Sequence, residues 1–351
     1  MQIGMLGLLG AGKKTLFKLL TGVTVQTVPP KGLPSNFHVR DPRVDRLHEM
    51  YNPKKTNYAR MDVLLLPDVE KTQGKAAWLG DVRDLDGLIC VVRAFDDPSV
   101  FHPSGTVDAA RDLDTFMSEL QFADMLFLDK RVSNLKNELR TRRSVEKENE
   151  LKLIERLAGE MEAGNAIRSA ELSESEARLL SSYQFLTDKP VIAVINAAQG
   201  TDAAQLRGEI EQAYPGRVAC AVFDVKLEGE IAEIEDAAEK KEFLEGLGIA
   251  EPAVAVLTRV IYDSMGLMSY FTVGEDEVRA WTVPQGSNGP RAARAIHSDL
   301  ERGFIRVEVM KYEDLIGLGG EAQVKEAGKF MLKGKEYIVE EGDILSFRAA
   351  T

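Results

Sequence analysis

Residues 7 to 15 constrain this chain most, because they match a phosphate-binding loop at every position but one. They read Gly7-Leu8-Leu9-Gly10-Ala11-Gly12-Lys13-Lys14-Thr15. Such a loop needs a glycine before its lysine, since backbone N–H groups must converge on the phosphates while the chain turns into a helix. Only Gly12 and Lys13 meet this condition, so Lys14 occupies the position of the hydroxyl residue that normally binds Mg²⁺. The loop therefore predicts a nucleotide site that lacks its usual metal ligand.

The flanking sequence supports this assignment. Residues 1–6 form a short apolar, strand-like run, and the segment from Thr15 has helical periodicity. The alternative is an ordinary strand-to-helix turn that happens to contain glycines. Further buried-strand candidates recur at residues 63–66, 88–92, 191–195 and 218–222. Because helical stretches separate several of them, we expect an α/β fold with a mostly parallel sheet.

Length, charge and cysteine content narrow the class of protein. The chain has 351 residues, enough for two or three domains, and a formal net charge of -12, which argues against general affinity for nucleic acid, DNA included. Cys90 and Cys220 both lie in apolar, strand-like stretches, as expected for buried reduced thiols. The sequence has neither a signal segment nor an apolar run of about 20 residues. We therefore expect a soluble cytoplasmic protein with no membrane contact.

A long helical insertion is expected between the third and fourth strands, over residues 112 to about 166. Its apolar residues recur mainly at spacings of three and four, which predicts two antiparallel helices with a packing seam between them. Basic residues crowd the segment 130–143, where Arg140, Arg142 and Arg143 come last. These arginines form either a solvated helix face or a contact for RNA phosphates.

The pattern changes after about Phe271. Short alternating strands are expected at residues 278–283, 304–309, 337–339 and 344–347, with one helix near 290–302. This arrangement predicts a small α+β module that consists of a sheet and one main helix.

The order of these elements, together with many local strings, resembles the YchF or Obg-like ATPase family of translation-factor-related P-loop proteins. The strings are Asp-Pro-Arg-Val-Asp-Arg-Leu (41–47), Val-Val-Arg-Ala-Phe (91–95), Tyr-Gln-Phe-Leu-Thr-Asp-Lys-Pro (183–190), Tyr-Phe-Thr (270–272), Glu-Val-Arg-Ala-Trp-Thr-Val (277–283), Ile-His-Ser-Asp (296–299), Gly-Phe-Ile-Arg (303–306) and Lys-Glu-Ala-Gly-Lys (325–329). The resemblance implies a G-domain-like nucleotide domain at 1–111 and 184–270, an inserted helical hairpin at 112–183, and a ubiquitin-like β-grasp (TGS) domain at 271–351. It also implies the ribosome or its RNA as partner. The oligomeric state is left open.

Two departures from the family pattern affect catalysis. The family has Gly-Lys-Ser-Thr where this chain has Lys14, and the family's Asp-x-Ala-Gly aligns with Leu65-Leu66-Pro67-Asp68. The register argues against Asp68 reaching the site. Since Mg²⁺ normally bridges the β- and γ-phosphates, its loss predicts weak or absent hydrolysis. Mg²⁺ is thus doubtful as a cofactor, no residue is assigned as a metal ligand, and Lys14 is expected to supply a replacement charge.

The base-recognition segments also differ. The family's Asn-x-x-Glu falls on Asn196, Ala198 and Gln199, and residues 224–228, which include Lys226, occupy the place of its second base loop. Guanine selection needs a carboxylate that accepts from two N–H groups, and neutral Gln199 has one amide oxygen. We therefore expect ATP or ADP to be favoured over GTP, with residues 10–15 at the phosphates. Asn196 could instead tie the strand end to the loop.

Three functions stay open at this stage. The first is a YchF-like protein that binds adenine nucleotide and hydrolyses it slowly or not at all. The second is an interaction protein for the ribosome or RNA whose pocket is a relict. The third is an active ATPase in which His102, which aligns with the family's proposed water-positioning histidine, is catalytic.

Overall fold

The computed structural model describes residues 1–69, 78–249 and 251–350, and it divides into two compact units. The first comprises Met1–Ser35 and Asp62–Val256, and the second Asn36–Met61 and Leu257–Thr351. The chain passes between them within β2 (Leu33–Val39), β4 (Ala59–Leu65) and α10 (Ala253–Ser264). The division into three domains predicted above stays a prediction.

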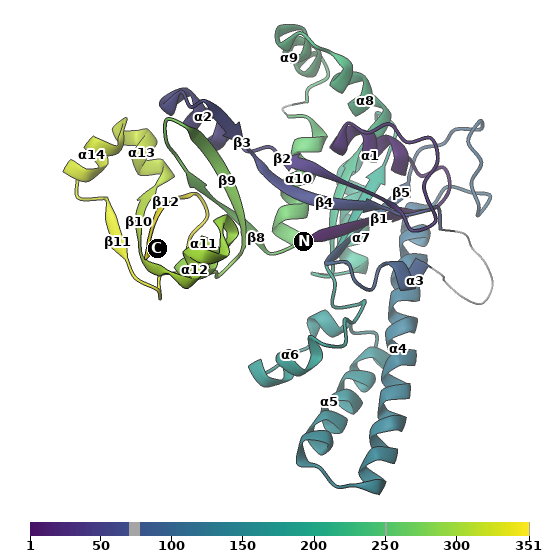
Figure 1. The fold of residues 1–351 in the computed structure, drawn as a ribbon. Helices are drawn as coiled ribbons and strands as arrows, with labels where there is room; N and C mark the ends of the chain where they lie inside the picture. The colour runs from purple at the N-terminus through teal and green to yellow at the C-terminus, as the bar shows by residue number, and fades with distance from the viewer. Residues whose placement is uncertain (70–77, 250, 351) are drawn as a thin grey trace. The chain divides into compact units, whose positions relative to one another are not determined.

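The first unit is built on a six-stranded sheet in the order β2-β4-β1-β5-β6-β7 (Figure 1). Its other strands are β1 (Gln2–Gly7), β5 (Gly87–Arg93), β6 (Val191–Asn196) and β7 (Val218–Phe223). All the pairings that join β4, β1, β5, β6 and β7 are parallel. The expected α/β fold with a mostly parallel sheet is therefore confirmed. The carboxyl ends of these strands form one edge, where ligands of such sheets bind.

The helices of this unit are α1 (Lys13–Thr21), α3 (Trp78–Asp81), α4 (Ala109–Thr141), α5 (Val145–Glu162), η1 (Ile167–Ser169), α6 (Glu174–Leu180), α7 (Ala203–Ala213), α8 (Val225–Glu233) and α9 (Ala237–Gly246). Long helix α4 leaves the sheet and α5 returns beside it, which confirms the antiparallel hairpin (Figure 1). The first part of the α4 stripe packs on the sheet through Leu113, Phe116 and Leu120. The later part packs on α5 through Leu128 and Leu135.

The second unit is an α+β module around a sheet in the order β11-β10-β12-β8-β9-β3. Its strands are β3 (Lys55–Asn57), β8 (Leu267–Thr272), β9 (Glu277–Pro284), β10 (Phe304–Lys311), β11 (Met331–Lys333) and β12 (Asp343–Ala349). Its helices are α2 (Pro42–Tyr51), α11 (Gly289–Ile296), α12 (Ser298–Arg302), α13 (Tyr312–Leu318) and α14 (Glu321–Glu326), together with most of α10. Tyr270, Val307 and Leu345 lie at its core.

Two local expectations about this module were wrong. Residues 337–339 are not a strand, because only Ile338 makes an isolated bridge, to Asn288. The expected helix over 290–302 is two helices, since the chain leaves helical geometry at His297, whose side chain caps α12 by accepting from the backbone N–H of Asp299.

Candidate functional site

The loop predicted to bind phosphate lies between β1 and α1, at the carboxyl edge of the sheet. Gly10 and Gly12 have φ of 78° and 96°, in the left-handed region that favours glycine. A Cβ on Gly12 would lie 2.4 Å from Nδ2 of Asn196, so a larger residue there would have to displace that side chain. The chain enters α1 at Lys13, and the N-terminal turn of this helix faces an open cavity of about 550 Å³.

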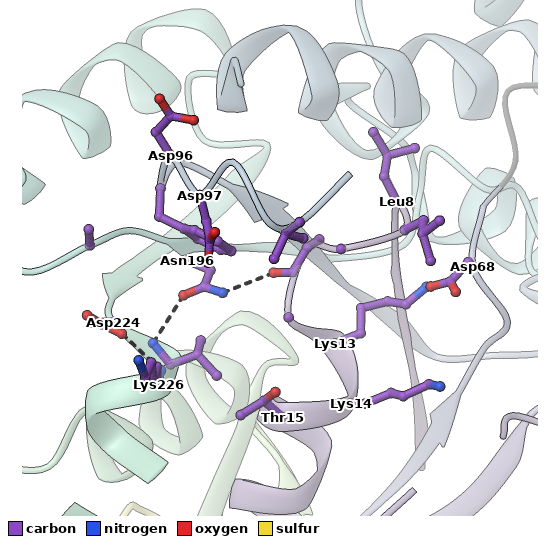
Figure 2. A pocket seen from close by; sticks show the side chains of 18 residues that line it. Leu8, Lys13, Lys14, Thr15, Asp68, Asp96, Asp97, Asn196, Asp224 and Lys226 are labelled. Atoms are coloured by element: carbon purple, nitrogen blue, oxygen red, sulfur yellow. Dashed lines mark hydrogen bonds and ion pairs between the residues drawn. The ribbon is translucent and has the colours of Figure 1, made fainter. Parts of the chain in front are cut away.

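The cavity gathers most of the residues predicted to bind nucleotide. It is lined by residues 8–15, Asp68, Phe95, Asp96, Asp97, Val100, Asn196, Ala198, Asp224, Val225 and Lys226. Figure 2 shows Lys13, Lys14 and Asp68 on one side and Asp224 and Lys226 on the other. Gln199 does not line it, and lies instead in a separate hollow of about 290 Å³ that shares Ala198 and Asp224. Gln199, which was expected to read the base, therefore does not line this cavity.

Lys13 is buried at the bottom of the loop, with only 4% of its surface exposed. Its Nζ donates to the carbonyls of Gly7 (2.7 Å) and Pro67 (3.2 Å) and lies 2.7 Å from Oδ1 of Asp68. Burial lowers the pKa of Lys13, and the hydrogen bond to Asp68 opposes that shift. The ammonium is thus held by three acceptors beside the cavity.

The expectation that Asp68 does not reach the site was wrong. The chain after β4 continues alongside β1: Leu66 donates its N–H to the carbonyl of Met5, and Val69 donates to that of Gly7. Val69 also forms a parallel bridge with Leu8. This extension carries Asp68 past the end of β4 to Lys13, a course that the alignment of sequence strings does not reveal.

The donor groups around the cavity do not fit Mg²⁺. Lys14 stands in the hydroxyl position and its Nζ donates to the carbonyl of Gln26 at 2.7 Å. Of the cavity's four carboxylates, Asp68 is paired with Lys13, Asp97 accepts from Ser99, and Asp224 accepts backbone N–H groups of α8. Asp96, the fourth, lies away from Lys13 and Lys14 (Figure 2). Within residues 1–69, 78–249 and 251–350, no three acidic, histidine or cysteine side chains cluster as metal ligands.

Asn196 ties three segments together at the end of β6. Its Nδ2 donates to the carbonyl of Ala11 at 3.1 Å, and its Oδ1 accepts from the N–H of Val225 at 3.1 Å (Figure 2). The tying role considered for Asn196 is thus observed, since the side chain connects the loop to the start of α8. Its part in reading a base stays a prediction.

Arg93, which the sequence analysis did not single out, holds the cavity wall that follows β5. Its guanidinium is buried and donates to three backbone carbonyls, those of Phe95 (3.0 Å), Val100 (3.0 Å) and Asp97 (3.1 Å). All three of these acceptor residues line the cavity. The sequence does contain a signal for this role, since Arg93 is a lone arginine at the end of an apolar strand. A charge buried there requires several hydrogen-bond partners.

His102 lies near the cavity but does not line it. Its ring is buried, with Nε2 3.0 Å from Oδ2 of Asp112 and Nδ1 accepting from the N–H of Ser104 at 3.1 Å. Both ring nitrogens are therefore engaged within the loop and with α4. The catalytic role suggested for His102 stays a prediction that would require the ring to leave these partners.

The tip of the hairpin presents the three arginines picked out by charge. Arg140, Arg142 and Arg143 are exposed. Basic residues nearer the hairpin stem are neutralised, as Arg131 pairs with Glu150 and Lys136 with Glu155. No described residue forms an ion pair with any of the three tip arginines. The tip is therefore a local concentration of unpaired positive charge.

Comparison with known proteins decides the family. The ribosome-binding ATPase YchF of Bacillus subtilis is 37% identical over 363 residues, covering 98% of both chains. The chain belongs to the YchF family. Obg-like ATPase 1 of rice (Oryza sativa subsp. japonica) is 30% identical and covers 99% of this chain and 92% of its own. Residues 267–350 match the family model YchF-GTPase_C, described as a protein of unknown function (DUF933).

Solved structures agree with this family assignment. The YchF GTPase of Schizosaccharomyces pombe superposes with a TM-score of 0.85 at 30% identity, over 99% of this chain and 97% of that one. A GTP-binding protein from Pyrococcus horikoshii, 18% identical with a TM-score of 0.61, shares the fold.

The described helices include none with the length and apolar character that a membrane crossing needs.

Proposed function

We propose that this YchF-family protein binds ATP or ADP in the cavity above α1, without Mg²⁺, and hydrolyses it slowly or not at all. The observation that carries the proposal is the loop itself, in which left-handed Gly12 leads directly into α1 with Lys13 behind it and Lys14 in the hydroxyl position. Backbone N–H groups and the positive helix end there favour a polyphosphate. Residues 10–15 are its expected contacts, with Asn196, Ala198 and Lys226 toward the nucleoside.

Metal independence is supported by charge. Lys14 brings a second cation to the loop beside Lys13, and two ammonium groups can offset part of the phosphate charge that Mg²⁺ would otherwise neutralise. Lys14 is exposed, and its contact to the Gln26 carbonyl is a single hydrogen bond, so its side chain is free to exchange partners. Lys13 and Lys14 thus supply the positive charge that the metal would otherwise supply.

Slow hydrolysis is supported by the groups that line the cavity, which are poorly suited to catalysis. Phosphoryl transfer depends on groups that stabilise the charge developing on the transferred phosphoryl and that orient the attacking water. The donor set around the cavity does not suit the metal, and His102 is engaged by Asp112 and Ser104. The protein would therefore report the presence of nucleotide through binding.

The ribosome is the proposed partner. Several relatives are named as ribosome-binding ATPases, among them those of Bacillus subtilis and Escherichia coli O157:H7. The exposed tip arginines offer contacts for RNA phosphates on a chain whose overall charge is negative. A ribosome-associated protein of this kind would be cytoplasmic.

Titration calorimetry on nucleotide-stripped protein tests the proposal, with ATP, ADP and GTP each measured in Mg²⁺ and in EDTA. We expect adenine nucleotides to bind with similar affinity in both buffers and GTP to bind more weakly. The absence of heat with every nucleotide would favour the second function, a ribosome-interaction protein whose cavity is a relict. A rapid turnover of ATP would favour the third, an active ATPase.

A further inference from the structure

The end of the cavity away from Lys13 is formed by the carboxyl ends of β6 and β7. Asn196, Ala198, Asp224, Val225 and Lys226 line this end, and Figure 2 shows Asp224 and Lys13 on opposite sides of the loop. If the phosphates of a nucleotide lie on the loop at α1, the base must lie toward this end. The groups here therefore decide which base fits.

Asp224 retains a free acceptor at this end. Its Oδ1 caps α8 by accepting from the N–H groups of Lys226 (2.9 Å) and Leu227 (3.1 Å). Its Oδ2 accepts no hydrogen bond from any residue that the structure describes. Asn196, by contrast, has its amide nitrogen and its oxygen both bonded to backbone groups. Among the described residues after β6 and β7 that line the cavity, Asp224 is therefore the one that offers an unused carboxylate oxygen to a base.

A lone carboxylate oxygen discriminates between purines at position 6. Adenine carries an amino group there, which donates a hydrogen bond, whereas guanine and hypoxanthine carry an oxo group, which accepts one. A carboxylate can only accept, so an oxygen that faces position 6 bonds the amino group and repels the oxo group, whereas an oxygen that faced position 1 would accept from the N–H of a 6-oxo purine. A site that meets one purine with a hydrogen bond and the other with repulsion separates them well.

Lys226 is the neighbouring group that could act in the opposite sense, because an ammonium donates to an oxo group. Its charge is a contributing cause of the lowered pKa of Asp97, after the hydrogen bonds from Ser99. Lys226 is also exposed, which weakens a single charged contact.

We propose that the Asp224 carboxylate selects 6-amino purines over 6-oxo purines in this cavity. The inference rests on the proposed function, since it requires a nucleotide in the cavity, and it names the residue responsible for the adenine preference. Selection is thereby assigned to the residue before α8 in place of Gln199, which faces a different hollow.

The test compares ATP with ITP, because both purines lack the 2-amino group of guanine and differ only at position 6 and in the proton on N1. Asp224→Asn keeps the helix cap, as asparagine caps as well as aspartate, and presents an N–H donor in place of the free oxygen. We expect the ratio of ATP to ITP affinity to fall about tenfold or more, as for the loss of one charge-assisted hydrogen bond. Asp224→Ser, which also caps, should lower the ratio without favouring ITP.

One control variant and one comparison variant make the result specific. Asp236 caps α9 in the same way, with Oδ1 accepting from the N–H groups of Ala238 and Glu239, and it does not line the cavity. Asp236→Asn should leave the ratio unchanged. Lys226→Ala, at an expected nucleoside contact, separates selection by the ammonium from selection by the carboxylate. If Asp224→Asn and Asp224→Ser keep the wild-type ratio while still binding ATP, or if Lys226→Ala alone changes it, the proposal is wrong and the proposed function survives. Wild-type protein that binds neither nucleotide contradicts both.

Discussion

The ammonium of Lys13 lies 2.7 Å from Oδ1 of Asp68 and also donates to the carbonyls of Gly7 and Pro67. Three acceptors match its three N–H donors, so a phosphate oxygen that reaches Lys13 has to displace one of them. The carbonyl of Gly7 is fixed at the end of β1, whereas the side chain of Asp68 is 36% exposed. Asp68 is the partner that can leave, which makes it a competitor of the nucleotide.

Asp68→Asn should therefore tighten ATP binding. The change removes a negative charge that competes for Lys13 and repels phosphate, and we expect the dissociation constant in EDTA to fall about tenfold, or about 1.4 kcal/mol. Titration calorimetry measures the change. Asp62→Asn, at an exposed position on β4 outside the cavity, is the matched control. Weaker binding by Asp68→Asn would mean that the carboxylate takes part in the nucleotide complex.

The lowered pKa of Lys13 predicts a dependence of ATP binding on pH. Burial is the main cause of the shift, so the ammonium loses its proton below its ordinary pKa of 10.5. Only the protonated form attracts phosphate, and ATP itself stays fully ionised above pH 8, so affinity should fall as the pH rises from 8 toward 10.5. Lys13→Arg, whose guanidinium does not titrate in this range, should give a flat profile, although its affinity can differ. Equal slopes for both proteins would exclude Lys13 as the titrating group.

Lys14→Ser should make nucleotide binding depend on Mg²⁺. The variant loses a cation and gains the hydroxyl that this position normally supplies to the metal. We expect its ATP affinity in EDTA to fall about tenfold or more and to recover partly with Mg²⁺, whereas the wild-type affinity changes little between the two buffers. Lys18→Ser, which alters an exposed lysine farther along α1, controls for the charge. Metal independence retained in Lys14→Ser would contradict the charge-replacement idea.

His102→Ala is expected to affect stability more than turnover. The change removes the contact to Oδ2 of buried Asp112, whose Oδ1 keeps its hydrogen bonds from Arg111, and should lower the free energy of unfolding by about 1–3 kcal/mol. Denaturant unfolding gives this value, and phosphate release gives the residual turnover, which we expect to equal that of the wild type. A loss of turnover in protein that remains folded and binds ATP would restore His102 as a catalytic residue.

Reversing two charges at the hairpin tip should weaken ribosome binding. Arg142→Glu with Arg143→Glu removes phosphate contacts, so the affinity for ribosomes should fall. The slope of log affinity against log salt concentration should also decrease in magnitude, by the contribution of about two phosphate contacts. Co-sedimentation with ribosomes over a range of KCl concentrations measures both effects. The control reverses Lys31 and Lys335, which are also exposed and lie outside the hairpin. Unchanged binding by the arginine variant would assign these residues to a solvated face.

The sequence reveals the parts of the fold that depend on local pattern. The glycines of the loop mark its register, because only Gly10 and Gly12 could take the left-handed turns observed there. Apolar runs predict β5 and β6, both buried along their entire length, and the periodic stripe predicts the α4 and α5 hairpin. Composition alone would not have separated these elements.

Other features depend on where the chain travels between elements. Asp68 reaches Lys13 because residues after β4 continue beside β1, and Gln199 misses the cavity because the turn after β6 carries it into a different hollow. The carbonyls that Arg93 binds come from a loop without a repeating pattern. Each of these features depends on the tertiary course of the chain. The local spacing of residues in the sequence does not predict that course.

The central claim is a nucleotide site that works with two lysines in place of a metal. It is tested most directly by titrating nucleotide-stripped wild-type protein with ATP in EDTA and again in Mg²⁺. Affinities within about threefold of each other, with ITP and GTP weaker in both buffers, are the predicted result. Binding that occurs only with Mg²⁺, or no binding in either buffer, would contradict the account.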